Sequence, residues 1–210
     1  MLNKIAVLVS GTGTNLKALI EAIKNNEIKN GKISLVISSN KNAKAIAIAR
    51  EANINTVVLD RKSFKLAHEF EEALFLTLKE ENPNLIVMAG FLCIIPKKIT
   101  DHFKNKIINI HPSLIPAFCG EGFYGLKVHE AALKKGVKIT GATVHFVNEI
   151  ADGGPIILQK SVEVKQTDSP EILQKRVMEQ AEWVILKKAI NYICLNKIYV
   201  KDNKTFIEEE

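Results

Sequence analysis

The stretch "KIAVLVSGTGTNLKALIEAIKNN", residues 4–26, decides the fold of this chain. Its first seven residues form an apolar run of strand length, and a glycine-rich turn follows. The second half places Leu16, Leu19, Ile20 and Ile23 on one side of a helix, which predicts an amphipathic helix. A buried strand, a short turn and a helix in this order form the first half of a βαβ unit, the building block of parallel sheets.

The same alternation continues along the first half of the chain. Apolar runs predict strands at 33–39, 55–60, 84–90 and 106–112, and amphipathic stretches predict helices at 43–53 and 64–82. Strands that are apolar throughout belong in a parallel sheet covered on both faces. We therefore expect an α/β fold, Rossmann-like and doubly wound, with a mostly parallel sheet.

The pattern changes after a helix predicted at 125–136. Two strands, 138–148 and 155–164, follow each other without a helix between them, which predicts an antiparallel C-terminal edge. Ser169 and Pro170 are a good cap and first-turn pair for a long helix reaching residue 193. The sequence of the tail, residues 197–210, predicts one more short strand followed by a fraying acidic end. No linker-like composition interrupts the chain, so we expect a single domain over residues 1–210.

Composition and charge limit the classes of function. The chain has 210 residues, of which 47% are hydrophobic, and its net charge is +6. This charge suits anionic ligands, but the lysines are scattered and no nucleic-acid-binding module is recognisable, so we expect no nucleic-acid partner. No apolar run has the length of a membrane span or the features of a signal peptide. We therefore expect a cytoplasmic protein without a membrane partner.

The three cysteines give no sign of a metal site or a disulfide framework. Cys93, Cys119 and Cys194 are far apart, without a CxxC pair or a His/Cys cluster. We expect buried or idle thiols and no bound metal.

The first loop, "SGTGTN" at residues 10–15, allows two interpretations. Its glycines let backbone N–H groups approach a ligand, and the helix N-terminus after it favours an anion. The loop is neither GxGxxG nor a Walker loop, which favours a single phosphate over a dinucleotide. The same residues also suit a tight turn with a helix cap at Thr14 or Asn15.

The predicted strand at 106–112 ends on two polar residues. Asn109 and His111 are two positions apart, so their side chains point to the same face at the carboxyl end of a parallel strand. Ligands bind at that edge in open α/β sheets. An amide N–H can stabilise a developing oxyanion, and an imidazole can transfer protons near neutral pH. We interpret the pair as catalytic.

A third catalytic candidate, Asp152, follows the predicted strand at 138–148, the first strand of the antiparallel pair. Asp152 lies in "ADGGPIIL", residues 151–158, where two glycines and a proline constrain the turn. A carboxylate near His111 raises the pKa of the imidazole and can relay protons. The remaining histidines suit structural roles, with His145 as a possible support for the site.

Five stretches together resemble one known family. "VLVSGTGTNLKALIEA", "AGFLCIIP", "NIHPSLIPAF", "GATVHFVNEIADGGPIILQ" and "RVMEQAEW" resemble the phosphoribosylglycinamide formyltransferases across nearly the whole chain. The resemblance implies transfer of a formyl group from 10-formyltetrahydrofolate to the amine of 5-phosphoribosylglycinamide, in de novo purine (IMP) biosynthesis. It implies small-molecule substrates, no metal, and a monomer or homodimer.

The resemblance also implies roles for individual residues. Asn109, His111 and Asp152 correspond to the catalytic trio, which stabilises the oxyanion and moves protons in a direct transfer. Residues that hold the ribonucleotide are implied to be Gly13, Thr14, Asn15 and Glu182. Residues around the folate are implied to be Leu92, Cys93, Ile94, Ile95, Asn109, Val147 and Ile150. Residues 1–100 then form a phosphate-binding half, and 101–210 a folate and catalytic half.

Two other functions fit the same sequence. Formyltetrahydrofolate deformylases resemble the chain at "PAFCGEGFYG" and "GVKITGATVHFV" and use water as the acceptor. Against them, Pro112 follows His111 where those enzymes carry a second histidine. A non-catalytic ligand-binding module is the other alternative, and it predicts binding without turnover.

Overall fold

The computed structural model describes residues 2–208. It divides into two compact units, Met1–Ile108 and Asn109–Glu210, and the boundary falls within strand β5 (Ile107–His111). The main sheet has seven strands in the order β3-β2-β1-β4-β5-β6-β7, and β8 and β9 form a second, two-stranded sheet. The predicted α/β class with a mostly parallel sheet is confirmed.

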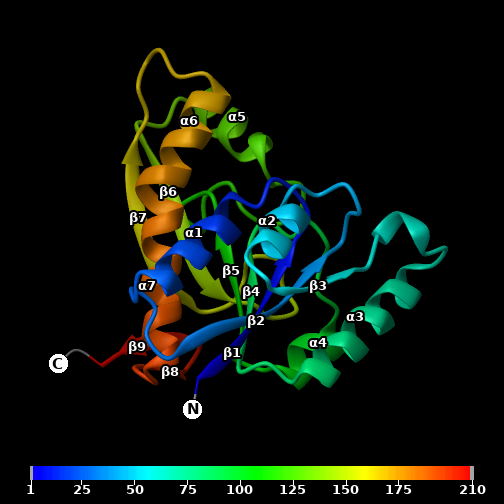
Figure 1. Cartoon of the computed structure of the whole chain (residues 1–210). Coiled ribbons are helices and arrows are strands. Elements are labelled where there is room, and N and C mark those ends of the chain that lie inside the picture. Colours follow the sequence, from blue (N-terminus) through cyan, green and yellow to red (C-terminus); the bar gives the residue numbers. More distant parts are fainter. Residues whose placement is uncertain (1, 209–210) are drawn as a thin grey trace. The chain divides into compact units, whose positions relative to one another are not determined.

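The first unit contains four parallel strands and the helices that connect them (Figure 1). The strands are β1 (Asn3–Val9), β2 (Gly31–Ser38), β3 (Asn55–Val58) and β4 (Leu85–Met88). The helical elements are α1 (Thr14–Lys24), α2 (Ala45–Glu51), the 3₁₀ turn η1 (Arg61–Ser63), α3 (Ala67–Glu81) and α4 (Lys97–His102). All four residues of β4 are buried, as a strand covered on both faces requires.

The order of these strands creates a switch point beside β1. The chain adds β2 and β3 on one side of β1 and then returns to place β4 on the other side. The loops that leave the carboxyl ends of β1 and β4 therefore lie next to each other, and the Ser10 N–H donates to the Gly90 carbonyl at 3.0 Å. In open α/β sheets this is the place where ligands bind.

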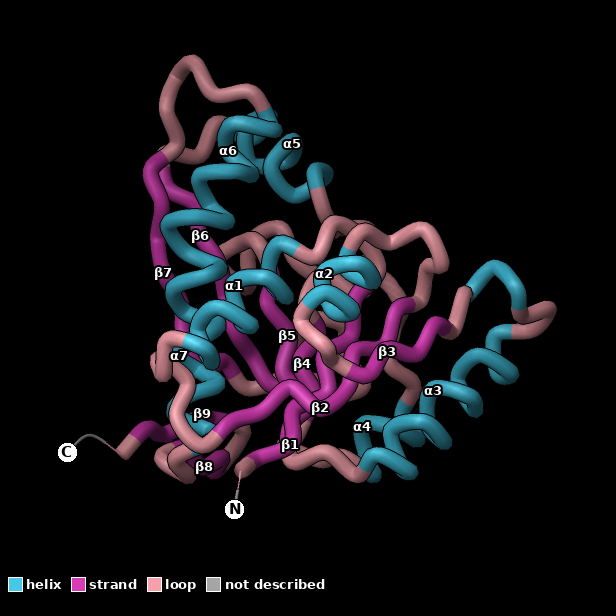
Figure 2. Tube along the Cα trace, viewed as in Figure 1, coloured by secondary structure: helices cyan, strands magenta, loops and turns pink. Residues whose placement is uncertain are grey.

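The second unit carries the antiparallel edge. Its elements after β5 are α5 (Leu126–Lys135), β6 (Ile139–Phe146), β7 (Ile156–Glu163), α6 (Pro170–Val177), the π-helical turn η2 (Met178–Glu182), α7 (Trp183–Cys194), β8 (Ile198–Lys201) and β9 (Lys204–Ile207). Strands β6 and β7 pair antiparallel, as predicted. Figure 2 shows α6 and α7 running in line along these two strands.

Several predicted boundaries need correction. Helix α4 was not predicted, because six residues are too few for a clear apolar period. The long C-terminal helix is interrupted by the π-helical turn η2, which accommodates extra backbone within a helix and often marks a functional position. The tail forms two strands instead of one, joined at Asp202 and Asn203, which both adopt positive φ. The last two acidic residues, 209 and 210, lie outside the described residues.

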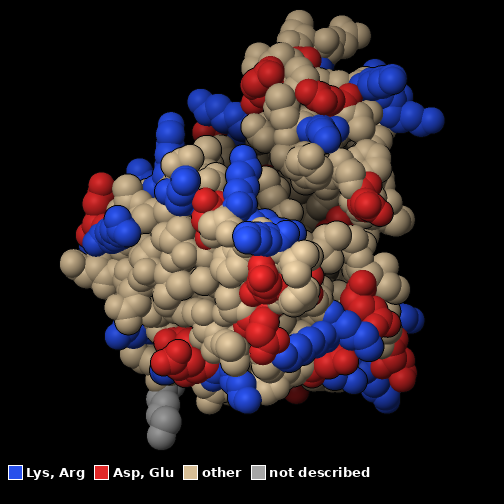
Figure 3. All heavy atoms as spheres, turned by 90° about the vertical axis from the view of Figure 1, so that its right-hand side faces the viewer, with Lys and Arg blue, Asp and Glu red and all other residues tan. Residues whose placement is uncertain are grey.

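The surface agrees with the scattered charge of the sequence. On the face drawn in Figure 3, basic and acidic side chains are interspersed. Among residues 2–208, no helix combines the length and the apolar character that crossing a bilayer requires.

Candidate functional site

Gly13 in the first loop is fixed by its backbone conformation and by helix α2. It caps α1 with φ at 78°, in the left-handed region, so the predicted cap at Thr14 or Asn15 is wrong. A Cβ atom on Gly13 would also lie 2.7 Å from the Cα atom of Ala45. Thr14 begins α1 and Asn15 is buried in its first turn. The two interpretations of this loop, phosphate site and tight turn, remain compatible with this geometry.

Two buried serines connect the first loop with the predicted folate segment 92–95. The Ser10 and Ser39 hydroxyls lie 2.6 Å apart, and Ser10 Oγ accepts a hydrogen bond from the Leu92 N–H at 2.9 Å. Neither serine is among the predicted site residues, although each directly follows a buried strand. They hold the carboxyl ends of β1 and β2 against the start of segment 92–95.

Segment 92–95 exposes apolar side chains at this edge. Leu92 and Ile94 are 61% and 73% exposed, whereas Ile95 is buried. Cys93 is partly buried, and burial raises the pKa of its thiol although Ser39 and Arg61 act in the opposite direction. Exposed leucine and isoleucine next to a switch point offer an apolar surface to a planar ligand.

Asn109, His111 and Asp152 lie together in the second unit. His111 Nδ1 is 3.3 Å from Asp152 Oδ2, and Asn109 Nδ2 donates to Asp152 Oδ1 at 3.4 Å. His111 is buried, and Asn109 is partly buried. The sequence predicted that the β5 pair and the turn aspartate would meet, and the structure brings these side chains into contact.

His145 on β6 is a fourth member of this cluster. Its Nδ1 donates to the Phe146 carbonyl at 2.8 Å, and its Nε2 lies 3.3 Å from Asn109 Nδ2 and 3.4 Å from Asp152 Oδ1. A neutral His145 offers a bare Nε2 to the Asn109 amide, whereas a protonated one offers an N–H to Asp152. The neutral form therefore orients Asn109, and the protonated form orients Asp152.

The backbone after β5 holds both members of the His111–Asp152 pair. His111 Nε2 donates to the Phe118 carbonyl at 2.9 Å, and the Gly120 N–H donates to Asp152 Oδ2 at 2.9 Å. Both nitrogens of His111 therefore face oxygen atoms, which is the arrangement that an imidazolium ion satisfies. Asp152 has φ at 55°, a conformation that aspartate tolerates better than most residues.

The environment moves both pKa values downward. Burial lowers the pKa of His111, and the Asp152 carboxylate and the Phe118 carbonyl, which raise it, offset only part of this effect. Asp152 raises the pKa of His111, as expected, but burial is the stronger influence and the net shift is downward. Burial raises the pKa of Asp152. The contacts with His145, His111 and Gly120 together have a larger, opposite effect, so the net shift is downward.

His129 on α5 is a buried titratable group close to this cluster. Its side chain is fully buried, and neither ring nitrogen has a hydrogen-bond partner among the described residues. Burial and the nearby His111 lower its pKa from 6.5 to about 4. The structural role predicted for His129 agrees with its place in the interior.

His129 should make the protein less stable in mild acid. The unfolded chain binds a proton near pH 6.5 and the folded chain only near pH 4, so the free energy of unfolding falls as the pH drops through this window. Between pH 7.5 and 5 we expect this residue to cost about 2 kcal/mol. Urea unfolding at both pH values should show His129→Leu losing about 2 kcal/mol less than wild type.

The control for this prediction is His68→Leu, which removes an exposed imidazole from α3. It should lose the same stability as wild type over that pH range. An equal acid loss in His129→Leu would show that His129 is protonated as easily in the folded chain as in the unfolded one.

The remaining predicted site residues of the second unit differ in exposure. Val147 is partly buried, and Ile150 is 63% exposed on the turn between β6 and β7. Gly154 on the same turn cannot carry a side chain, since a Cβ atom would lie 1.9 Å from the Phe146 carbonyl oxygen. Glu182 is buried at the end of the π-helical turn η2, which contacts β6 and β7.

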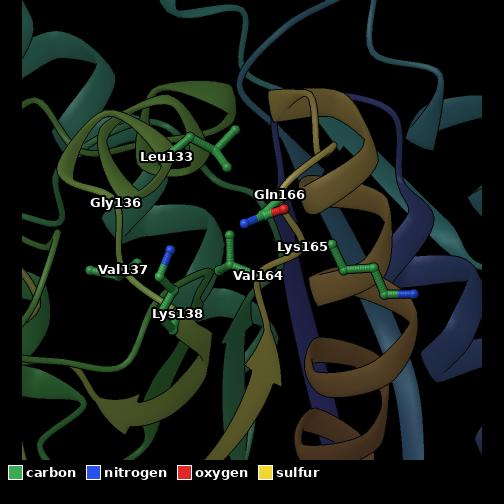
Figure 4. Close-up of a pocket in the computed structure, with 7 residues that line it drawn as sticks. All are labelled: Leu133, Gly136, Val137, Lys138, Val164, Lys165 and Gln166. Carbon is green, nitrogen blue, oxygen red and sulfur yellow. The ribbon is translucent and has the colours of Figure 1, made fainter.

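A hollow elsewhere in this unit does not coincide with the cluster. It measures about 200 Å³ and is lined by Leu133 of α5 and by residues of the α5–β6 and β7–α6 connections, including Lys138 and Gln166 (Figure 4). Figure 4 also shows the Lys165 side chain directed away from Lys138 and Gln166. None of its lining residues is a predicted site residue, so the chemistry of the cluster, and not the shape of this hollow, identifies the candidate site.

The described part of the chain contains no group of three or more His, Cys, Asp or Glu side chains placed to hold a metal ion. Its cysteines are all free thiols. Burial raises the pKa of Cys194 to about 11, and burial and the nearby Asp152 raise the pKa of Cys119, so both thiols favour the protonated form. The cluster of Asn109, His111, His145 and Asp152 combines amide, imidazole and carboxylate groups, which are suited to hydrogen bonding and proton transfer.

Comparison with known proteins identifies the family. The family model described as formyl transferase matches residues 3–189. The chain belongs to the formyl transferase family. A phosphoribosylglycinamide formyltransferase from Haemophilus influenzae is 38% identical over 207 residues, which cover 99% of this chain and 94% of that protein.

Solved structures of formyl transferases have the same fold. Glycinamide ribonucleotide transformylase 1 from Symbiobacterium toebii matches with a TM-score of 0.92 and 34% identity, covering 99% of this chain and 95% of that chain. A formyltetrahydrofolate deformylase from Pseudomonas syringae matches with a TM-score of 0.88 and 25% identity, and this chain covers 67% of it. The chain is thus more similar in sequence to the transformylase from Symbiobacterium toebii than to this deformylase.

Proposed function

We propose that this protein is a phosphoribosylglycinamide formyltransferase. It transfers the formyl group of 10-formyltetrahydrofolate to the amine of 5-phosphoribosylglycinamide, giving formylglycinamide ribonucleotide and tetrahydrofolate in de novo purine biosynthesis. The observation that carries the proposal is the contact of Asn109, His111 and Asp152 in a chain whose similarity to such an enzyme extends over 99% of its length.

The side chains of the cluster take separate roles in the transfer, for which 10-formyltetrahydrofolate supplies the formyl group. Asn109 Nδ2 carries two hydrogens, so one can stay on Asp152 or His145 while the other donates to the formyl oxygen as negative charge develops there. His111 in its protonated form places positive charge near the same oxygen. The developing negative charge itself raises the pKa of His111 and offsets the effect of burial.

Asp152 moves the proton between the two nitrogen atoms of the reaction. Its lowered pKa keeps it ionised at neutral pH, so it can accept a proton from the attacking amine. It then returns the proton to N10 of the folate, which makes the folate nitrogen a better leaving group. No bond between the enzyme and the formyl group is needed.

The binding roles follow the predicted halves of a single domain. Residues 1–100 supply the phosphate loop at Gly13, Thr14 and Asn15, where backbone N–H groups of the helix N-terminus favour an anion. Segment 92–95, Val147 and Ile150 contact the folate, and the exposed apolar side chains of Leu92, Ile94 and Ile150 support this role. Glu182 binds the ribose hydroxyls. We further propose that the enzyme is cytoplasmic and acts as a monomer or homodimer.

The second candidate function is formyltetrahydrofolate deformylase, which the structural match to such an enzyme favours. The acceptor decides between the two. Purified protein is mixed with 10-formyltetrahydrofolate or its 5,8-dideaza analogue, and loss of the formyl group is followed by absorbance. Turnover only in the presence of 5-phosphoribosylglycinamide supports the transferase. Equal turnover without it means that water is the acceptor.

A further inference from the structure

We propose that Gln159 on β7 is a positioning residue for His111, acting through the backbone segment Ser113–Gly120. This inference rests on the proposed function for its effect on turnover. Gln159 is an exposed glutamine whose side-chain amide donates to Ile115 and Thr143, which are outside the catalytic cluster. Its contacts are with the segment that holds His111 and Asp152.

The first step runs from Gln159 to the backbone of Ile115. Gln159 Nε2 donates to the Ile115 carbonyl at 2.9 Å and to Thr143 Oγ1 at 3.0 Å. Thr143 lies opposite Gln159 in the β6–β7 register, and its hydroxyl accepts the Ile115 N–H at 3.1 Å. Both polar backbone groups of Ile115 are thus held by side chains of these two strands.

The second step runs from Ile115 to the ends of the segment. The Thr143 hydroxyl donates to the Ser113 carbonyl at 2.7 Å. The buried Ser113 hydroxyl in turn donates to the Ala117 carbonyl at 2.6 Å, and it lies 3.3 Å from the Phe118 carbonyl oxygen. Phe118 has φ at 50°, a conformation that a large side chain adopts only when its surroundings enforce it. The direction of the Phe118 carbonyl therefore depends on these bonds.

The third step is the contact with the cluster. The Phe118 carbonyl accepts from His111 Nε2, and the Gly120 N–H donates to Asp152 Oδ2. A shift of segment 113–120 would therefore displace both partners of the His111–Asp152 pair at once. Since a misplacement of about 1 Å can cost about a hundredfold in rate, a side chain that only steadies this segment can matter for turnover.

The test replaces the donor without changing the length of the side chain. Gln159→Met loses both hydrogen bonds, and because Gln159 is exposed, the variant should fold and melt like wild type. We expect kcat to fall about tenfold or more, with little change in KM for either substrate. Gln166→Met, the same change at an exposed glutamine in the β7–α6 connection, should leave kcat unchanged.

A second variant separates hydrogen bonding from packing. Gln159→Glu keeps the size of the side chain but cannot donate to the Ile115 carbonyl when ionised. A loss of kcat similar to that of Gln159→Met supports the inference. Wild-type kcat in Gln159→Glu would overturn it, because the side chain would then only fill space.

A measurement without turnover keeps this inference separate from the proposed function. Titration of His111 by NMR should show a lower pKa in Gln159→Met than in wild type, because the Phe118 carbonyl that favours the protonated ring is less firmly placed. The other titratable groups near His111, namely Asp152, His145 and His129, are unchanged in this variant. An unchanged His111 titration would overturn the positioning role whatever the reaction turns out to be.

Discussion

Replacing Asn109 by alanine should lower kcat roughly a hundredfold to a thousandfold, which is the cost of removing one donor to a developing oxyanion. The loss should appear in kcat and kcat/KM together, because the hydrogen bond to the formyl oxygen strengthens only as charge develops. Steady-state formyl transfer from the dideaza folate to 5-phosphoribosylglycinamide measures both quantities. The melting temperature should change little, since the bonds of Asn109 to His145 and Asp152 are long and Asn109 is only partly buried.

The control is Asn42→Ala, at an exposed asparagine of the first unit. It should keep wild-type kinetics. If Asn109→Ala also turns over at close to the wild-type rate, the amide is not the oxyanion donor, and His111 alone would have to stabilise the charge.

Two of the three predicted catalytic residues, Asn109 and His111, follow from a local rule in the sequence. Asn109 and His111 share a face through the two-residue period of a strand, and the end of that strand is a known ligand edge. Asp152 required more: its turn was recognisable, but its contact with a residue 41 positions away followed only from the family resemblance. The structure brings the three side chains together as expected.

The partners of the trio were harder to predict, because they are backbone groups and a buried side chain on another strand. The Phe118 carbonyl and the Gly120 N–H leave no trace in the residue types, since any residue has such groups. The sequence predicts only a supporting role for His145, and the distance of its side chain to Asp152 depends on how β6 and β7 pair. The balance that lowers the pKa of His111 could not be predicted either, because it depends on burial.

The fold shows the same division between local and tertiary information. The strands of the first unit were found because they are apolar throughout, and the boundaries agree within a few residues. The π-helical turn at Met178–Glu182 was missed, because the residues around it continue a helical pattern without a proline or glycine. This turn determines the position of Glu182. Among the predicted site residues, the ribose contact of Glu182 therefore depends most on structure that the local sequence does not reveal.

Replacing Asp152 by asparagine should lower kcat roughly a hundredfold to ten-thousandfold, the range expected for a group that transfers protons. Asparagine has nearly the same shape but cannot accept the proton of the attacking amine. It also removes the negative charge that raises the pKa of His111, so this pKa should fall below its wild-type value. The pH profile of kcat/KM should then shift along the pH axis in addition to losing height.

The direction of that change follows from the role of protonated His111. Activity falls as the pH rises through the pKa at which His111 loses its proton, so the alkaline limb of the profile should lie at lower pH in Asp152→Asn than in wild type. Asp101→Asn, at an exposed aspartate of α4, should leave both rate and profile unchanged.

Three outcomes of Asp152→Asn separate the two roles assigned to this carboxylate. A large rate loss with a shifted alkaline limb means that Asp152 both transfers the proton and maintains the charge of His111. A large loss with an unshifted limb leaves proton transfer as its only role, since His111 would then hold its proton without the carboxylate. A rate within a few-fold of wild type would remove Asp152 from the mechanism, and the amine would have to lose its proton to water instead.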